Sequence, residues 1–174
     1  RIGANEPRPI DLPHAYVAAQ REYAGRDPDA DHVFDYAQRV ASTPGKKDGL
    51  YWEAKEGEVQ SPLGPLAAEA AREGYAKKGK GGKPVPFHGY FFRILTAQGK
   101  NAPGGRYSYI VKEKMILGFA MVAYPANYGA SGIMTFLVNQ EGTVYQKDLG
   151  RDTARKAVAM MEYDPDKSWK KVEE

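Results

Sequence analysis

Residues 118–150 read GFAMVAYPANYGASGIMTFLVNQEGTVYQKDLG, and this stretch decides the fold. Two runs within it, 132–138 and 143–148, are rich in apolar and β-branched residues and flank a short turn. Gly142 in that turn can take the positive φ that tight hairpin turns need, so the pattern predicts a β-hairpin. Residues 134–150 contain no histidine and no glycine-rich phosphate-binding loop, which indicates scaffold rather than an active site.

The segments before this hairpin continue the strand pattern. The run FHGYFFRILTA, residues 87–97, is apolar on both alternating faces, which predicts a strand covered on both sides. Two further runs, 106–111 and 115–124, are predicted to pair as a second hairpin around Lys112–Lys114. Residues 84–150 therefore predict an antiparallel sheet of about five strands.

The N-terminal part, residues 1–76, is predicted to be mainly helical. Asp11 can cap a helix that ends near Gly25. The apolar stripe of this helix has helical spacing and consists of Leu12, Tyr16, Ala19 and Tyr23. A second helix is predicted from a further stripe, formed by Val33, Phe34, Ala37 and Val40. A third helix is predicted with Ser61 as its N-cap and Pro62 as its first helical residue.

Residues 151–164 predict a C-terminal helix that is capped by Asp152. Its inward stripe is predicted to consist of Ala154, Val158 and Met161. Trp169 in the following tail is predicted to anchor that tail onto the body. Helices followed by strands and one last helix are typical of the α+β class. We therefore predict one domain over residues 1–174, in which N-terminal helices pack on the antiparallel sheet.

Composition excludes several classes of protein. The net charge of +3, from 25 basic and 22 acidic residues, is too balanced for a nucleic-acid-binding surface. The chain has no cysteine, which excludes disulfides, thiolate catalysis and cysteine–zinc sites. The longest apolar run, residues 115–124, reaches half of the ~20 residues that a membrane-spanning helix needs, so no membrane span is predicted. Because the chain begins at Arg1, we interpret it as a processed product from which any signal peptide is already removed.

The acidic loop RDPDADHVFDYAQ, residues 26–38, is the best candidate site. Calcium prefers several carboxylate and carbonyl oxygens, and alternating aspartates before a helix supply them. The candidate ligands for calcium are Asp27, Asp29, Asp31 and Asp35. The loop departs from an EF-hand loop in having His32 in place of the glycine and Gln38 in place of the bidentate glutamate. The alternative is an acidic loop whose aspartates only cap the following helix.

Signals for catalysis are weaker, and no catalytic residue is assigned. His88, a distant aspartate and Ser131 could form a triad, but YGASG lacks the spacing of a nucleophile elbow. Exposed tyrosines could stack on sugar or peptide, whereas half-buried tyrosines with hydrogen-bonded hydroxyls are the structural alternative. The tyrosines concerned include Tyr51, Tyr75, Tyr90, Tyr107, Tyr109, Tyr124, Tyr128 and Tyr145.

Three long strings carry a resemblance to a known family: STPGKKDGLYW, FHGYFFRILTAQGKNAPGG and GFAMVAYPANYGASGIMTFLVNQEGTVYQKDLG. They closely resemble a family of exported bacterial proteins, the domain-of-unknown-function family twenty-nine fifty. The resemblance extends from IGANE to SWKKV and covers nearly the whole chain. It implies a secreted or periplasmic protein, and it implies that this chain is the C-terminal part of a longer exported precursor.

A weaker similarity links the chain to the globular domain of type IV pilins and pseudopilins. It is carried by AYVAAQREYA, GYFFRI, VAYP and TFLVNQEGTVYQ. This similarity implies a pilin-like arrangement, in which a long N-terminal helix packs on an antiparallel sheet. Pro7, Pro9 and Pro13 fall where a pilin helix would run unbroken, so we treat it as an analogy of fold alone.

These observations leave three hypotheses about function. The first, which we favour, is a non-enzymatic structural or interaction domain of the cell envelope, with other envelope proteins or a glycan as partners. The second is a ligand-binding module for glycan, peptide or calcium. The third is an undescribed hydrolase that acts through His88.

Overall fold

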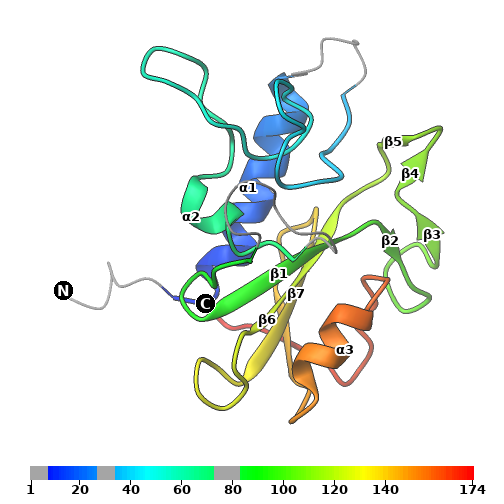
Figure 1. Cartoon of the computed structure of the whole chain (residues 1–174). Coiled ribbons are helices and arrows are strands. Elements are labelled where there is room, and N and C mark those ends of the chain that lie inside the picture. Colours follow the sequence, from blue (N-terminus) through cyan, green and yellow to red (C-terminus); the bar gives the residue numbers. More distant parts are fainter. Residues whose placement is uncertain (1–7, 27–33, 73–82) are drawn as a thin grey trace.

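The computed structural model describes residues 8–26, 34–72 and 83–174. It has the predicted α+β class, with helices before and after an antiparallel sheet (Figure 1). The helices are α1 (Asp11–Arg26), α2 (Pro65–Ala68) and α3 (Thr153–Ala159). The main sheet has five strands, which in spatial order are β1 (Tyr90–Leu95), β6 (Ala120–Pro125), β7 (Met134–Asn139), β8 (Tyr145–Asp148) and β9 (Lys170–Lys171). Every neighbouring pair of these strands is antiparallel.

The hairpin predicted from residues 134–150 is confirmed as β7 and β8. Met134 lies opposite Asp148, and Leu137 lies opposite Tyr145. The connecting turn contains Gly142 at a φ of 83°, a backbone conformation that glycine adopts without the strain of a side chain. This hairpin forms the centre of the sheet together with β6, because β6 pairs with the other side of β7.

Residues 106–111 lie outside the main sheet, although the sequence predicts them as one of its strands. Two small two-stranded sheets take up this region: β2 (Ala97–Gln98) with β3 (Tyr107–Ser108), and β4 (Ile110–Val111) with β5 (Lys114–Met115). The predicted hairpin at Lys112–Lys114 therefore exists, but as a small separate sheet. The fifth strand of the main sheet is instead β9 in the C-terminal tail. Trp169, which precedes β9, is 9% exposed and anchors this tail as predicted.

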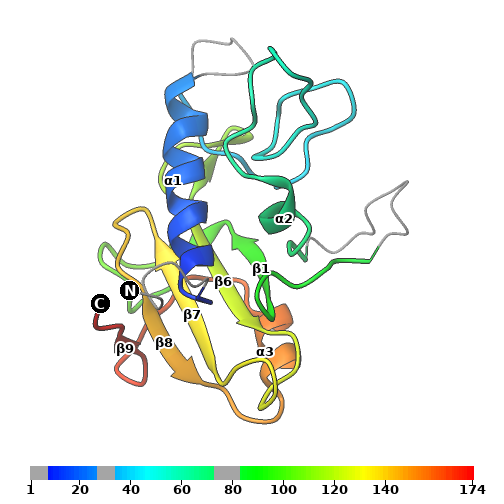
Figure 2. The same cartoon turned by 90° about the vertical axis from the view of Figure 1, so that its left-hand side faces the viewer.

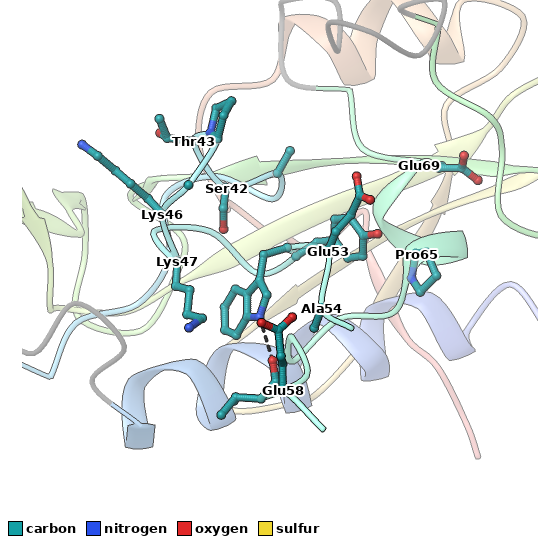
Figure 3. Close-up of a pocket in the computed structure, with 15 residues that line it drawn as sticks. Ser42, Thr43, Lys46, Lys47, Glu53, Ala54, Glu58, Pro65 and Glu69 are labelled. Carbon is teal, nitrogen blue, oxygen red and sulfur yellow. Dashed lines mark hydrogen bonds between the residues drawn. The ribbon is translucent and has the colours of Figure 1, made fainter. Parts of the chain in front are cut away.

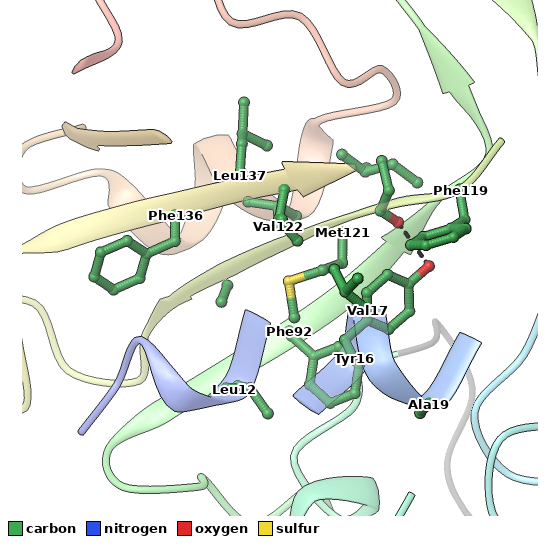
Figure 4. Packing of buried hydrophobic residues seen from close by; sticks show 14 of the residues in the cluster. Leu12, Tyr16, Val17, Ala19, Phe92, Phe119, Met121, Val122, Phe136 and Leu137 are labelled. Atoms are coloured by element: carbon green, nitrogen blue, oxygen red, sulfur yellow. Dashed lines mark hydrogen bonds between the residues drawn. The ribbon is translucent and has the colours of Figure 1, made fainter. Parts of the chain in front are cut away.

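Helix α1 covers one face of the main sheet (Figure 2). The ring of Tyr16 lies 6.3 Å from the ring of Phe92 and 5.6 Å from that of Phe119, measured between centroids (Figure 4). The Tyr16 hydroxyl donates to the carbonyl of Ala120 on β6 at 3.0 Å, and Gln20 donates to that hydroxyl at 3.1 Å. The predicted apolar stripe is confirmed, since all its members are buried: Leu12, Tyr16, Ala19 and Tyr23.

Helix α3 covers the opposite face of the sheet (Figure 1). Its buried residues are Thr153 and Ala157, whereas the sequence predicts Ala154, Val158 and Met161 as the inward stripe. That prediction is wrong, because Val158 is 44% exposed and Met161 is 71% exposed. The small side chains of Thr153 and Ala157 let the helix lie close to the sheet, and the larger side chains then face outward.

Residues 34–41 form no helix and contain only isolated β-bridges and bends, so the second predicted helix is wrong over its described part. The backbone N–H of Tyr36 donates to the carbonyl of Met115 at 2.8 Å. The backbone N–H of Ala37 donates to the side-chain oxygen of Gln20 on α1, also at 2.8 Å. Backbone groups held by these distant partners cannot form the i to i−4 bonds of a helix. Val33, the first residue of the predicted stripe, lies outside the described residues.

Helix α2 begins at Pro65 rather than at Pro62, and its N-cap is Gly64. Ser61, the predicted cap, instead donates its hydroxyl to the carbonyl of Leu63 at 2.8 Å. The helix is therefore one short turn of four residues. Residues 42–64 before it form loops and turns, and these loops carry the pocket described next.

Candidate functional site

A pocket with a cavity volume of about 580 Å³ lies between the loops of residues 41–59 and α2 (Figure 3). A volume of this size falls within the range of roughly 300–1,000 Å³ that small-molecule sites occupy. Its lining residues are Ala41, Ser42, Thr43, Pro44, Gly45, Lys46, Lys47, Tyr51, Trp52, Glu53, Ala54, Glu58, Val59, Pro65 and Glu69. We therefore take this pocket as the candidate functional site.

The first wall of the pocket is a tight turn at residues 43–46. Proline at the second position and glycine at the third favour a type II turn, in which the third residue has positive φ. Gly45 has a φ of 80°, and the N–H of Lys46 donates to the carbonyl of Thr43 at 2.8 Å. The sequence Thr-Pro-Gly-Lys thus determines the conformation of this wall through local interactions, without the need for tertiary contacts.

Asp48 ties the turn to the rest of the loop. Its carboxylate accepts hydrogen bonds from the backbone N–H and from the hydroxyl of Thr43, each at 2.7 Å. Burial of this carboxyl opposes its ionisation, but the bonds from Thr43 and the charge of Arg39 outweigh burial and hold the pKa of Asp48 below its usual value. The ionised form of Asp48 is therefore the one that stabilises the loop.

The two loop segments approach each other closely at Gly49. A Cβ atom at this position would lie 2.7 Å from the carbonyl oxygen of Val40 and 2.9 Å from the backbone nitrogen of Ser42. Only glycine fits between these backbone atoms. The close approach lets Ala41 and Tyr51 form a parallel β-bridge, which brings both segments to the pocket.

Trp52 is the large aromatic side chain of the pocket. Its indole N–H donates to the carbonyl of Val59 at 2.9 Å, and the residue is only 9% exposed (Figure 3). The ammonium nitrogen of Lys47 lies 5.8 Å from the centre of the Trp52 ring, within the range of a cation–π contact. The hydrogen bond fixes the ring orientation, so the apolar part of the lining is preorganised.

Charges of both signs line the pocket. Figure 3 shows Lys46 and Lys47 on one side, Glu53 and Glu69 on the other, and Glu58 between the two groups. Burial raises the pKa of the Tyr51 hydroxyl, and the negative charges of Glu53 and Glu69 raise it further. Both carboxylates therefore act on the same part of the lining.

The charged side chains of the pocket are not paired with one another. Within residues 8–26, 34–72 and 83–174, no ion pair joins Lys46 or Lys47 to the glutamates of the pocket. Glu58 accepts one hydrogen bond, from the backbone N–H of Lys55 at 2.7 Å. The charges of Lys46, Lys47 and the glutamates of the pocket can therefore act on a molecule that enters it.

The predicted calcium loop is only partly described. Asp27, Asp29 and Asp31 lie in residues 27–33, outside the described residues, while Asp35 is described and is 9% exposed. Among the described residues, no group of three or more histidine, aspartate and glutamate side chains is placed to hold a metal ion. The calcium site at the acidic loop stays a prediction.

Of the residues considered for a hydrolase triad, Ser131 has a structural role in a loop. His88 is exposed, and its ring lies 4.1 Å from that of Phe87 between centroids. The hydroxyl of Ser131 donates to the carbonyl of Gly89 at 2.9 Å and accepts from the backbone N–H of Asn127 at 3.0 Å. The bond to Gly89 links the loop between β6 and β7 to the chain before β1, and the bond from Asn127 closes that loop on itself, so Ser131 has a structural role.

Sequence reasoning missed the pocket. Its first wall lies in TPGKKDG, which the sequence marks only as a loop, and Trp52 is the third residue after it. A large aromatic residue between two turn-rich loops is the signal that could have pointed to it. Of the tyrosines proposed for stacking, Tyr90, Tyr109 and Tyr124 are core residues that are at most 2% exposed. The half-buried ones are Tyr51, Tyr107, Tyr128 and Tyr145, of which Tyr51 lines the pocket, and Tyr75 lies outside the described residues.

The sequence profile of a family described as "Protein of unknown function (DUF2950)" matches residues 1–172. Neither the curated proteins nor the solved structures contain a match to this chain. The similarity to pilins therefore gains no support from a solved structure. Among the described residues, no helix is both long enough and apolar enough to cross a membrane.

Proposed function

The chain belongs to the DUF2950 family, and we propose that it is a non-enzymatic interaction domain whose ligand site is the pocket between residues 41–59 and α2. The family description names no activity, so the proposal rests on the pocket itself. The observation that supports this proposal is the indole ring of Trp52, which a hydrogen bond holds in place in the lining. Charged side chains that are not paired with one another surround it. Such a combination of an apolar surface with a few convergent polar groups is typical of ligand sites.

The chemistry of the lining favours binding over catalysis. The hydroxyls of Ser42 and Thr43 already serve the loop: Ser42 accepts from the N–H of Gly49, and Thr43 donates to Asp48. A nucleophilic hydroxyl needs a base within hydrogen-bond reach that can take its proton, and the partner of Thr43 is a carboxylate engaged in holding the turn. The lining offers charge and apolar surface, which are means of recognition.

We further propose that the protein acts outside the cytoplasm, in the periplasm or at the cell envelope, with an envelope protein or glycan as partner. The support for this location is the resemblance to exported bacterial proteins described above. Fractionation of host cells, with antibodies against the native protein, tests it. Recovery of the protein with cytoplasmic markers, and its absence from the periplasmic and extracellular fractions, would overturn the proposed location.

The binding proposal is tested by nuclear magnetic resonance with the full chain labelled with nitrogen-15. A library of small polar fragments should move the backbone resonances of residues 42–47 and the indole resonance of Trp52. The variant Ala54→Phe places a bulky ring in the lining and should abolish these shifts. Its thermal unfolding midpoint, compared with that of the wild type, checks that the fold is retained.

The matched control is Ala159→Phe, which changes an exposed residue on α3, on the far side of the sheet from α1. It should bind fragments as the wild type does. If no fragment moves the resonances of the pocket, or if Ala54→Phe leaves the shifts unchanged, the pocket is not the ligand site.

A further inference from the structure

The arrangement of charges in the pocket points to one ligand class: we infer that the pocket binds a short peptide with both ends free. This inference rests on the proposed function and names its ligand. The cationic amino end would lie at Glu53 and Glu69, and the carboxylate end at Lys46 and Lys47. The apolar middle of the peptide would cover Trp52.

The acidic side selects a cation. Glu53 and Glu69 come from different elements, the loop after Trp52 and the C-terminal end of α2, and both act on the hydroxyl of Tyr51. Two exposed carboxylates near one point repel each other, and a cation placed between them relieves this repulsion. An ammonium group can also donate hydrogen bonds to both carboxylates.

The basic side selects an anion. Lys46 and Lys47 follow the fixed turn at Thr43, so their backbone positions are set by the bond between Lys46 and Thr43. Both side chains are exposed, and Lys47 keeps its ammonium near the ring of Trp52. A carboxylate that entered the pocket beside Trp52 would therefore meet a positive charge already in place.

Apolar surface continues from the pocket toward α2. Val59 and Pro65 line the pocket, and Val59 is 57% exposed. Leu66, the residue after Pro65, is 69% exposed. Exposed apolar residues that adjoin a pocket often mark a binding surface. They would receive an apolar side chain of the peptide.

A neutral glycan fits this lining less well. Sugar recognition needs side-chain groups that exchange hydrogen bonds with hydroxyls, and three neutral side chains of the lining are already bonded within the protein. Ser42, Thr43 and Trp52 are bonded to Gly49, Asp48 and Val59 respectively. The charged groups remain, and they favour a ligand that carries charges of its own.

The experiment titrates the full chain with four forms of the tripeptide Ala-Leu-Ala, followed by calorimetry and by the resonances of residues 42–47 and Trp52. The forms have free ends, an acetylated amino end, an amidated carboxyl end, or both modifications. An exposed charge pair contributes at most about 1 kcal/mol, which corresponds to roughly fivefold in the dissociation constant. We expect each single modification to weaken binding by roughly fivefold, and both together to weaken it further.

Paired variants assign each end to its side of the pocket. Glu53→Gln with Glu69→Gln should weaken the free-ended peptide but not the acetylated form, which has no cation to lose. Lys46→Gln with Lys47→Gln should weaken the free-ended peptide but not the amidated form. Glu141→Gln and Lys156→Gln, exposed residues outside the pocket lining, are the matched controls and should change neither.

The outcomes separate this inference from the proposed function. If all four peptides bind equally, or if a neutral disaccharide moves the resonances of the pocket while no peptide does, the peptide inference is wrong and the pocket remains a ligand site. If neither these probes nor the fragment library moves those resonances, both proposals fail. Binding that weakens as salt rises from about 0.05 M to about 0.5 M supports the role of the charges.

Discussion

The guanidinium of Arg93 donates through Nη1 to the carbonyl of Met160 at 2.8 Å and to that of Ala157 at 3.2 Å. Arg93 lies on β1, and the two carbonyls belong to the end of α3. The last carbonyls of a helix lack intrahelical partners, and Arg93 supplies a charged donor to that of Met160. The carbonyl of Ala157 also accepts from the backbone N–H of Met160 at 3.2 Å, so Arg93 is its second donor. This one side chain thus joins the edge strand of the sheet to the helix that covers it.

Replacement of Arg93 should therefore loosen α3. We expect Arg93→Ala to lower the free energy of unfolding by about 1–3 kcal/mol, because half-buried carbonyls lose a charged donor. Urea unfolding followed by circular dichroism measures the change. Arg155→Ala is the matched control, since Arg155 is exposed and pairs only with Asp152 on the surface, and it should change stability by less than about 0.5 kcal/mol. Equal effects of the two variants would contradict the capping role.

Buried tyrosines predict a loss of stability at high pH. Burial raises the pKa of Tyr90 to about 12, and burial also raises the pKa values of Tyr16, Tyr109 and Tyr163. Above pH 10 the unfolded chain releases protons that the folded chain keeps, so the free energy of unfolding falls as pH rises. Each tyrosine contributes up to about 1.4 kcal/mol per pH unit until its folded pKa is reached.

Urea unfolding between about pH 8 and pH 12 measures this dependence. The free energy of unfolding should be level near pH 8–9 and fall steeply above pH 10. Tyr16→Phe should reduce the slope, although it also lowers stability at pH 8 by roughly 1 kcal/mol through loss of the bond to Ala120. A slope above pH 10 that is the same in Tyr16→Phe and in the wild type would count against a raised pKa of Tyr16.

The turn between β4 and β5 is strained. Lys112 and Glu113 have φ values of 49° and 72°, although such turns favour Asn-Gly because both positions need positive φ. We expect Lys112→Asn with Glu113→Gly to stabilise the protein by about 1 kcal/mol, measured by urea unfolding. Gly142→Ala is the reverse control, since Gly142 has a φ of 83° and no side chain crowds it, and it should destabilise by a similar amount. A destabilised Asn-Gly variant would show that the lysine and glutamate side chains stabilise the turn.

Gly49 should be intolerant of any side chain. In Gly49→Ala the new methyl group meets backbone atoms of Val40 and Ser42, which cannot move without separating the two loop segments. The expected loss is about 1–3 kcal/mol, seen as a lower thermal midpoint and as shifted resonances of the pocket. Gly64→Ala is the control, because nothing lies within 4 Å of a Cβ there; it alters only the N-cap of α2, and the loss of stability should stay below about 1 kcal/mol.

The calcium prediction is tested on the acidic loop directly. If Asp27, Asp29, Asp31 and Asp35 bind calcium, millimolar calcium should raise the thermal midpoint, because a ligand that binds only the folded state stabilises it. Asp29→Asn with Asp31→Asn should abolish the rise, and magnesium at the same concentration should give a smaller one. An unchanged midpoint at millimolar calcium would argue against the site.

The sequence correctly predicts a helix and its buried face where only one apolar stripe is present. The apolar stripe of α1 is buried as predicted, because the large apolar residues of this helix lie on one face and no second face competes with it for burial. In α3 two stripes of equal spacing interleave, Ala154/Val158/Met161 and Thr153/Ala157, and the larger one is exposed. Periodicity identifies the helix but cannot tell which stripe faces the sheet when the space under the helix admits only small side chains.

Long-range bonds explain the errors at residues 34–41 and at the pocket. The partner of the Ala37 N–H is Gln20, 17 positions away, and no local pattern contains this information. The pocket likewise depends on the approach of Gly49 to the backbone at Val40, which only the folded chain displays. The sequence indicates the turn that begins at Thr43. It does not indicate that this turn forms the wall of a cavity.

The outer edge of β1 is occupied at Phe92. Its N–H donates to the carbonyl of Ala70 at 3.0 Å, and its carbonyl accepts from the N–H of Arg72 at 2.7 Å. At the opposite edge, β9 is two residues long and both are exposed lysines. To add a strand to the main sheet, a second molecule would have to displace residues 70–72 at the edge of β1 or bind beside the two lysine ammonium groups of β9. Growth of a fibril by addition of strands to either edge of the main sheet is thereby discouraged.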